Sequence, residues 1–375
     1  MCIRDRFILW DANLAKTMID NIYSLVVSYF GSSYLILAIV SFLFLIILAT
    51  SNYGKYILGG KDTSPEFSYF SWIGMLFCSG IGGGIIYWSG VEWAYYVGIP
   101  QFSIEAYSSE AYSLATAYGL FHWGLSAWSI YGIPAIALSI AFYKYNLNSL
   151  RLSSSLKGLG IPDIESSYFG RFIDLIFILA TVGAAGGTIG SYIPMLSSGF
   201  TDLLNINNGL HINIGVILLC VALYGYSVYK GLENGIKILS NFNLVLALIF
   251  LCLIVVSSDF KELLKLSVSG IQYSFSYFWS MSTLGISEPS DFAKEWTIFY
   301  WAWWVAFGPL VGLFIARISK GRSLRQVIIG MLFFGTLGTW LFYLVLGGYS
   351  MNGELNNEIN VVQNMKDIGL SLIHI

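Results

Sequence analysis

Apolar runs long enough to cross a lipid bilayer recur along this sequence, and they restrict its fold more than any other feature. A helix of about 20 apolar residues spans the hydrocarbon core of a membrane. Only 11% of the 375 residues are charged, against about 25% in soluble domains. Such a chain cannot cover a water-soluble core, so the sequence predicts an all-α polytopic membrane protein. A porin-type barrel would need short segments of alternating polarity, which this sequence lacks.

We expect eight membrane-spanning helices in a single domain over residues 7–369. Several of the runs exceed about 20 residues and must tilt, break or extend beyond the membrane. They cover residues 24–49, 69–98, 110–143, 171–201, 212–228, 239–257, 296–316 and 325–349.

Both ends of the chain look foreign to the rest. Residues 1–6 (MCIRDR) have the sequence that a common sequencing adaptor encodes in frame, and residues 370–375 (LSLIHI) match its reverse complement. We interpret both as adaptor artefacts and exclude them from fold reasoning. The natural protein is then expected to continue beyond both ends.

Basic residues indicate how the chain is oriented in the membrane. The loops after the first, third, fifth and seventh predicted helices hold twelve Lys and Arg, whereas the alternate loops hold three. Cytoplasmic loops are enriched in these residues, so the first set is predicted to face the cytoplasm and residues 258–295 to face outside. The net charge of −2 does not indicate a nucleic-acid partner, and none is expected.

Residues 259–285 differ from the spanning segments. Phe260, Leu263 and Leu264 recur at helical spacing, with charged side chains opposite them. This pattern predicts an amphipathic helix that lies at the outer membrane surface. A solvated loop is the alternative.

Two predicted spans contain helix-breaking residues. Residues 80–84 include four glycines, and Gly costs roughly 1 kcal/mol relative to Ala inside a helix. We predict that the chain unwinds there and can approach a ligand closely, with tight helix packing as the alternative. In the seventh span, Gly308-Pro309 is predicted to break the helix as well. Broken helices five spans apart are typical of transporters built from inverted repeats, which would place one repeat at 69–257 and the start of another at 296–349.

Aromatic side chains gather on the third and seventh predicted spans. Trp123, Trp128 and Tyr131 can share one broad helix face, and Trp301 and Trp304 lie three residues apart. We expect no acidic partner near these rings, so a permanent cation would suit them. A desolvated ring face attracts such a cation by about 2 kcal/mol. Rings that only pack or face lipid are the alternative.

Few polar residues lie inside the spans. Glu92 is interpreted as a structural or gating hydrogen-bonding residue near the outer mouth. His122 is expected to be a hydrogen-bonded packing residue, with a proton relay as the alternative. Thr181 and Thr188 flank a small-residue stretch that is interpreted as packing, with a cation site as the alternative. Because no metal-ligand or nucleophile–base spacing stands out, no enzyme activity is expected.

These motifs resemble those of the betaine/carnitine/choline transporter family over residues 11–350. The most specific piece is WTIFYWAWW at 296–304, supported by Phe121-His122-Trp123 and the glycine run. The resemblance implies a twelve-helix secondary transporter of the leucine-transporter fold, here without the first helix and the last three. It also implies a homotrimer with the outer amphipathic helix at the contact.

The resemblance further implies a substrate with a trimethylammonium or similar group, such as glycine betaine, choline or carnitine. The expected function is import across the cell (inner) membrane, with sodium as the coupling ion and no other cofactor. A sodium-independent exchanger or proton-coupled carrier of the family is the alternative, and an aromatic-rich channel or receptor is the alternative from another class. Ala185 and Phe307 depart from the family pattern. The implied substrate-binding residues are Trp123, Trp128, Tyr131, Trp304, Trp303, Gly80, Gly82 and Gly84, and the implied sodium-binding residues are Cys78, Ile81 and Thr181.

Overall fold

The computed structural model describes residues 12–80, 83–145, 151–159, 163–207 and 209–368. Both suspected adaptor segments lie outside these residues. The described elements are all helical, apart from an isolated bridge between Ile57 and Ser323. The helices are α2 (Ala12–Thr50), η1 (Asn52–Lys55), α3 (Tyr69–Gly80), α4 (Gly83–Tyr96), α5 (Ser109–His122), α6 (Leu125–Lys144), η2 (Leu152–Leu159), η3 (Ile164–Ser166), α7 (Tyr168–Leu204), α8 (Leu210–Tyr229), η4 (Leu232–Ile236), α9 (Lys237–Ser257), α10 (Phe260–Thr283), η5 (Ala293–Ile298), α11 (Phe299–Ile318), α12 (Leu324–Ile329), η6 (Gly330–Gly335), α13 (Thr336–Phe342), η7 (Tyr343–Gly347), α14 (Gly348–Leu355) and α15 (Val361–Ile368).

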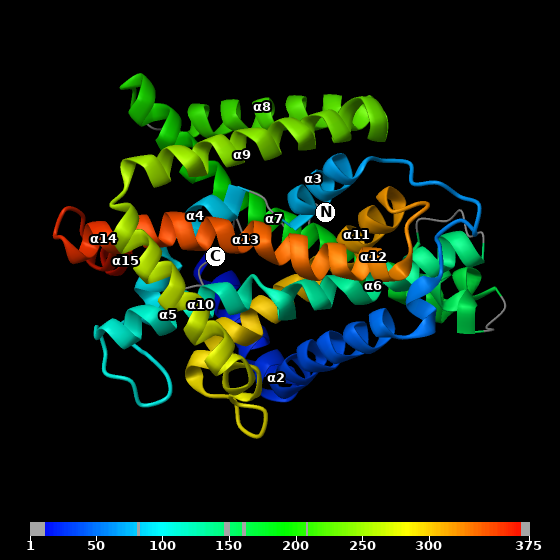
Figure 1. Cartoon of the computed structure of the whole chain (residues 1–375), viewed down its shortest axis with the longest axis horizontal. Coiled ribbons are helices and arrows are strands. Elements are labelled where there is room, and N and C mark those ends of the chain that lie inside the picture. The colour runs from blue at the N-terminus through cyan, green and yellow to red at the C-terminus, as the bar shows by residue number, and fades with distance from the viewer. Residues whose placement is uncertain (1–11, 81–82, 146–150, 160–162, 208, 369–375) are drawn as a thin grey trace.

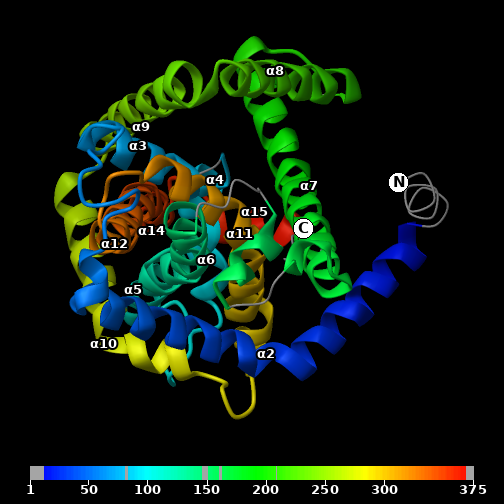
Figure 2. The same ribbon diagram turned by 90° about the vertical axis from the view of Figure 1, so that its right-hand side faces the viewer.

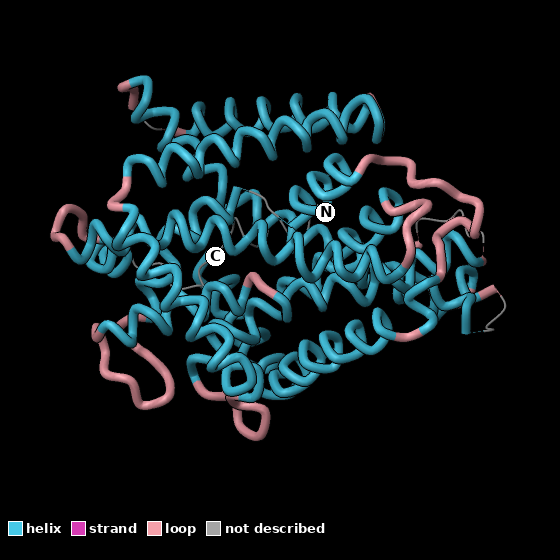
Figure 3. The backbone as a smooth tube through the Cα atoms, viewed as in Figure 1, coloured by secondary structure: helices cyan, strands magenta, loops and turns pink. Residues whose placement is uncertain are grey.

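The length and apolarity of the helices confirm an all-α polytopic membrane fold. Seven helices in the described ranges can cross a membrane, and the bent pair α3–α4 makes an eighth. Two views place α8 and α9 along one edge of the molecule and α2 along the opposite edge (Figures 1 and 2). Figure 3 shows that the loops lie mostly at the ends of the helices. The main buried cluster draws on α3–α6 and α11–α13 between these edges.

The second span is broken at the glycine run, as predicted. α3 and α4 meet at an angle of 57°. Ile81 and Gly82 lie outside the described residues. A Cβ atom at Gly84 would overlap the side chain of Tyr192 on α7. Glycine is therefore needed at this position because another helix approaches its backbone closely.

The third span is two helices, whereas the sequence predicts one over 110–143. α5 ends at His122 and α6 begins at Leu125. The carbonyl oxygens near the break are hydrogen-bonded by α13: Leu120 accepts from the Trp340 indole N–H at 2.8 Å, and Trp123 accepts from the Thr339 hydroxyl at 2.5 Å. Irregular backbone within a membrane requires such internal partners, and these lie more than 200 residues away in the sequence.

The predicted break at Gly308-Pro309 is wrong. α11 continues from Phe299 to Ile318 with Pro309 inside it. Proline removes one helical hydrogen bond, but packing against neighbouring helices maintains such a helix in a membrane. Here α11 lies close to α6, since a Cβ atom at Gly312 would come within 2.7 Å of the Ala135 nitrogen. The irregular turn is instead the π-helical segment η5 that precedes α11.

Residues 260–283 form the helix α10, so the alternative of a solvated loop is wrong. Its buried side includes Leu263 and Gly270, and it packs against α5 and α14. Phe260 and Leu264 are exposed. The apolar residues that the spacing groups together therefore divide between a buried and an exposed side.

Candidate functional site

A cavity of about 250 Å³ lies where α3, the α5–α6 break, α6, α7, α8 and α11 meet. Aromatic rings form much of its wall. Its lining residues are Cys78, Ser79, Trp123, Tyr131, Thr188, Tyr192, Tyr224, Trp303, Trp304, Phe307 and Val311.

Trp304 on α11 is the centre of the predicted aromatic box. Its ring centroid lies 4.5 Å from that of Tyr131 and 5.6 Å from that of Trp123, whose ring is almost perpendicular at 78°. Trp123 occupies the break after α5, and Tyr131 belongs to α6. Their proximity thus arises from the packing of α6 on α11 rather than from a shared face of one helix. Such differently oriented ring faces can surround a cation and attract it without requiring it to donate a hydrogen bond.

Trp128 has a different position from the other three predicted box residues. Its ring lies 6.0 Å from that of Trp304, but it is fully buried and is not among the residues that line the cavity. Gly335 packs directly against it. Trp128 therefore packs against Trp304 without lining the cavity itself.

Trp303 lines the same cavity and also a second, largely apolar cavity of about 300 Å³. Thr188 and Tyr192 of α7 border both spaces as well. The two cavities therefore adjoin across one group of side chains. Phe307, which departs from the family pattern, lines only the first of these two cavities.

The remaining predicted residues lie at or near the broken span, except for one on α7. Cys78 lines the cavity, and its thiol lies 3.6 Å from the Ser240 carbonyl oxygen. Gly80 ends α3. Thr181 lies on α7, and its buried hydroxyl has no hydrogen-bond partner, which leaves its oxygen available to a cation. Within the described ranges, no group of three or more His, Cys, Asp and Glu side chains could hold a metal ion.

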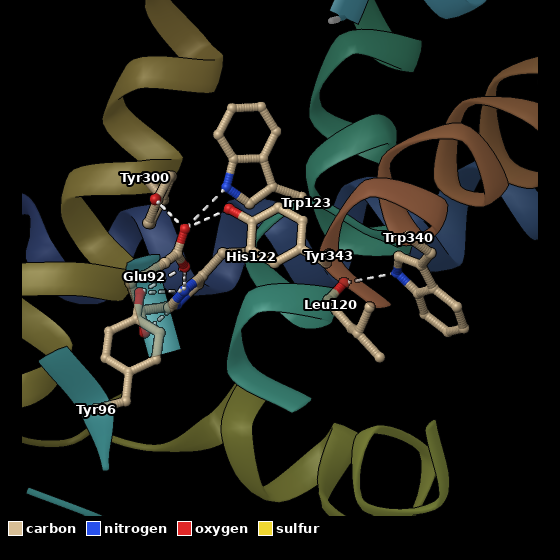
Figure 4. A network of polar contacts seen from close by, with 9 residues as sticks. Glu92, Tyr96, Leu120, His122, Trp123, Tyr300, Trp340 and Tyr343 are labelled. Carbon is tan, nitrogen blue, oxygen red and sulfur yellow. Dashed lines mark hydrogen bonds and ion pairs between the residues drawn. The ribbon is translucent and has the colours of Figure 1, made fainter. Parts of the chain in front are cut away.

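Glu92, interpreted from the sequence as a structural or gating hydrogen-bonding residue, does form hydrogen bonds in the structure. Its side chain is fully buried on α4 and lies within a polar network (Figure 4). The hydroxyls of Tyr96 and Tyr300 each donate to its carboxylate at 2.6 Å, and the hydroxyl of Tyr343 donates to it too. The indole N–H of Trp123 donates to the same carboxylate at 3.3 Å. The expectation that no acidic side chain accompanies the rings is therefore wrong.

His122 extends this network. Its Nδ1 lies 3.5 Å from a Glu92 carboxylate oxygen, and its Nε2 lies 3.0 Å from the Thr297 hydroxyl. Its ring stacks on Tyr300 with centroids 4.7 Å apart. The structure thus shows the hydrogen-bonded packing histidine that the sequence favours.

Comparison with known proteins gives the same family as the motifs. The sequence profile of the betaine/carnitine/choline family transporters matches residues 5–373. The chain is 32% identical to glycine betaine transporter 1 of Vibrio parahaemolyticus, across 96% of the chain and 69% of the relative. It is 34% identical to the glycine betaine transporter OpuD of Bacillus subtilis, across 89% and 65%. It is 32% identical to the carnitine transporter of Acinetobacter baumannii, across 91% and 62%. The matched region thus spans 62% to 69% of these relatives.

Proposed function

Because the chain belongs to the betaine/carnitine/choline transporter family, we propose that it imports a quaternary-ammonium compound across the cell membrane. The observation that carries this proposal is the cavity bordered by Trp123, Tyr131 and Trp304. A quaternary ammonium has no N–H to donate, so ring faces are its natural receptor. Relatives that transport glycine betaine and carnitine support the same substrate class. The family consists of transporters rather than enzymes.

Transport would proceed by alternating access to this cavity. The broken span α3–α4 borders the cavity, as expected for a transporter whose central site lies at interrupted helices. Backbone amides near Gly84 would bind the carboxylate of a betaine-type substrate, because the start of a helix attracts anions. Tyr192, which lies against Gly84 and lines the cavity, would have to move for a ligand to reach that backbone.

Sodium symport is the proposed mode of coupling. Carbonyl groups at Cys78 and Ile81 would contribute to one sodium site, and the free hydroxyl of Thr181 to another. The trimer implied by the family resemblance would form at α10, whose exposed side carries Phe260 and Leu264. Chemical cross-linking through cysteines on that side would test the trimer, and a ladder that stops at a monomer would contradict it.

The transport proposal is tested with the full-length protein in proteoliposomes. We expect saturable uptake of at least one of radiolabelled glycine betaine, choline and carnitine, and stimulation of that uptake by an inward sodium gradient. Uptake that does not saturate for any of the three would contradict transport of this substrate class. Counterflow that is equally fast without sodium would contradict symport and identify an exchanger.

A further inference from the structure

Only two charged side chains are buried among the residues that the structure describes, Glu92 and Arg322. Arg322 lies in the turn between α11 and α12, where its guanidinium stacks between aromatic rings. Glu92 lies instead next to the cavity, one hydrogen bond away from Trp123. The transport cycle proposed above assigns this carboxylate no role.

We propose that Glu92 provides the counter-charge of the aromatic box and thereby sets its preference for cations. The inference rests on the proposed function. Glu92 does not line the cavity, so it is a positioning and electrostatic residue that acts on the ligand through Trp123. No proton or covalent bond is exchanged with the ligand in this role.

The side chains that contact the Glu92 carboxylate are mostly hydrogen-bond donors. The indole N–H of Trp123 can only donate, and the hydroxyls of Tyr96, Tyr300 and Tyr343 are all placed to donate. An ionised carboxylate accepts about four hydrogen bonds, whereas a protonated one needs an acceptor for its own O–H. Four hydrogen-bond donors are thus directed at the two carboxylate oxygens, and the Nδ1 atom of His122 lies 3.5 Å from one of them.

The hydrogen bond to Trp123 transmits this charge to the cavity. A charged acceptor polarises its donor, particularly where water is excluded. Electron density in the indole is thereby shifted toward the ring, which strengthens the attraction of its face for a cation. The carboxylate also attracts the cation directly, because its full burial prevents the screening that water would provide.

A purely structural role for Glu92 predicts a different result. If the network only holds α4, α5, α11 and η7 together, its loss should weaken the binding of every ligand alike. A counter-charge should affect the charged ligand and leave a neutral ligand of the same shape unchanged. The two roles are therefore separated by ligand pairs in which carbon replaces the quaternary nitrogen.

The test compares choline with its uncharged analogue 3,3-dimethylbutan-1-ol, and the zwitterion glycine betaine with 3,3-dimethylbutanoate, which keeps only the negative carboxylate. Dissociation constants are measured on the full-length protein in detergent by changes in tryptophan fluorescence. Glu92→Gln keeps the size of the side chain and removes its charge. We expect it to weaken binding of each quaternary-ammonium ligand about tenfold, to change binding of 3,3-dimethylbutan-1-ol less than twofold, and not to weaken binding of 3,3-dimethylbutanoate. Glu110→Gln, the same change at the exposed start of α5, is the control and should alter neither.

A second comparison leaves Glu92 intact in case its variant does not fold. Trp123→Phe and Trp304→Phe each replace an indole of the box by a benzene ring, but only the first breaks the hydrogen bond to Glu92. We expect the preference for the cation to fall further in Trp123→Phe. Equal losses in these two variants, or equal effects of Glu92→Gln on both members of a ligand pair, would overturn the inference. A parent protein that binds neither glycine betaine nor choline would contradict the proposed function instead.

Discussion

At the scale of single residues, Trp304 is the most informative side chain of the site. It is buried at 4% exposure, contacts three other predicted box rings and still lines the cavity. A ring held by its neighbours in this way keeps its face oriented toward a ligand. Its contribution to binding can therefore be measured by substitution.

We expect Trp304→Leu to weaken binding of a trimethylammonium ligand by about 1–2 kcal/mol, or roughly 5- to 30-fold, because one cation–π contact is lost. Trp304→Phe should lose less, since benzene keeps a weaker ring quadrupole. Binding is measured by isothermal titration on the full-length protein. Trp279→Leu, at an exposed position on α10, should bind like the parent. Identical affinities in all four proteins would return these rings to a packing role.

At the scale of elements, two close contacts hold the two halves of the broken span, α3 and α4, against other parts of the chain. Gly84 at the start of α4 lies against Tyr192 of α7. In the turn before α12, the guanidinium of Arg322 lies 4.2 Å from the ring centroids of both Tyr69 and Trp72. Each contact joins segments that are distant in the sequence.

Gly84→Ala should lower stability by about 1–3 kcal/mol, because its Cβ atom would overlap Tyr192. Thermal unfolding in detergent measures the effect. Gly90→Ala on the same helix is the matched control, since a Cβ atom there meets nothing within 4 Å. Adding Tyr192→Leu should restore part of the stability lost at Gly84. An unfolding midpoint unchanged by Gly84→Ala would show that the two helices separate more easily than the structure implies.

Arg322→Lys should destabilise the protein by about 1–3 kcal/mol although it keeps the charge, because an ammonium cannot stack between two rings as a planar guanidinium does. It would also lose the geometry of the 2.8 Å hydrogen bond from Arg322 to the Phe67 carbonyl. Arg317→Lys, at an exposed position on α11, should have little effect. Equal unfolding midpoints for the two variants would exclude the stacked arrangement as a source of stability.

At the scale of the whole molecule, the Glu92 network connects spans that are far apart in the sequence. Its hydrogen-bonding residues come from α4, α11 and η7, and Trp123 comes from the break between α5 and α6. By contrast, α7 and α8 lie at the periphery (Figure 2), with much of their apolar surface exposed. The spans that share the network are the ones we expect to move together during transport.

Orientation in the membrane is tested with single cysteines in a cysteine-free background. Cysteine at Lys320, an exposed residue after α11, should be protected from an impermeant thiol reagent applied to intact cells. Cysteine at Lys265, an exposed residue of α10, should react, because the excess of basic residues places the opposite loops in the cytoplasm. Permeabilised cells provide the labelling control. The reverse pattern would invert the predicted topology.

The sequence by itself determined the features that depend on local physics. Apolar runs of sufficient length specify helices, because a backbone in a membrane must satisfy its own hydrogen bonds. The glycine run marks the break between α3 and α4, and the spacing of Phe260 and its neighbours marks α10. The motif at 296–304 is enough to indicate the family.

Tertiary structure alone decided where partners distant in the sequence meet. The break after His122 depends on Thr339 and Trp340 for its carbonyl groups, so the local sequence does not predict it. Pro309 remains helical because α11 packs against α6. Glu92 and Trp123 are 31 residues apart in the sequence and form a hydrogen bond only because α4 packs beside the α5–α6 break. Periodicity encodes which residues a helix can bury, but a buried polar group takes its role from the partners that long-range packing places around it.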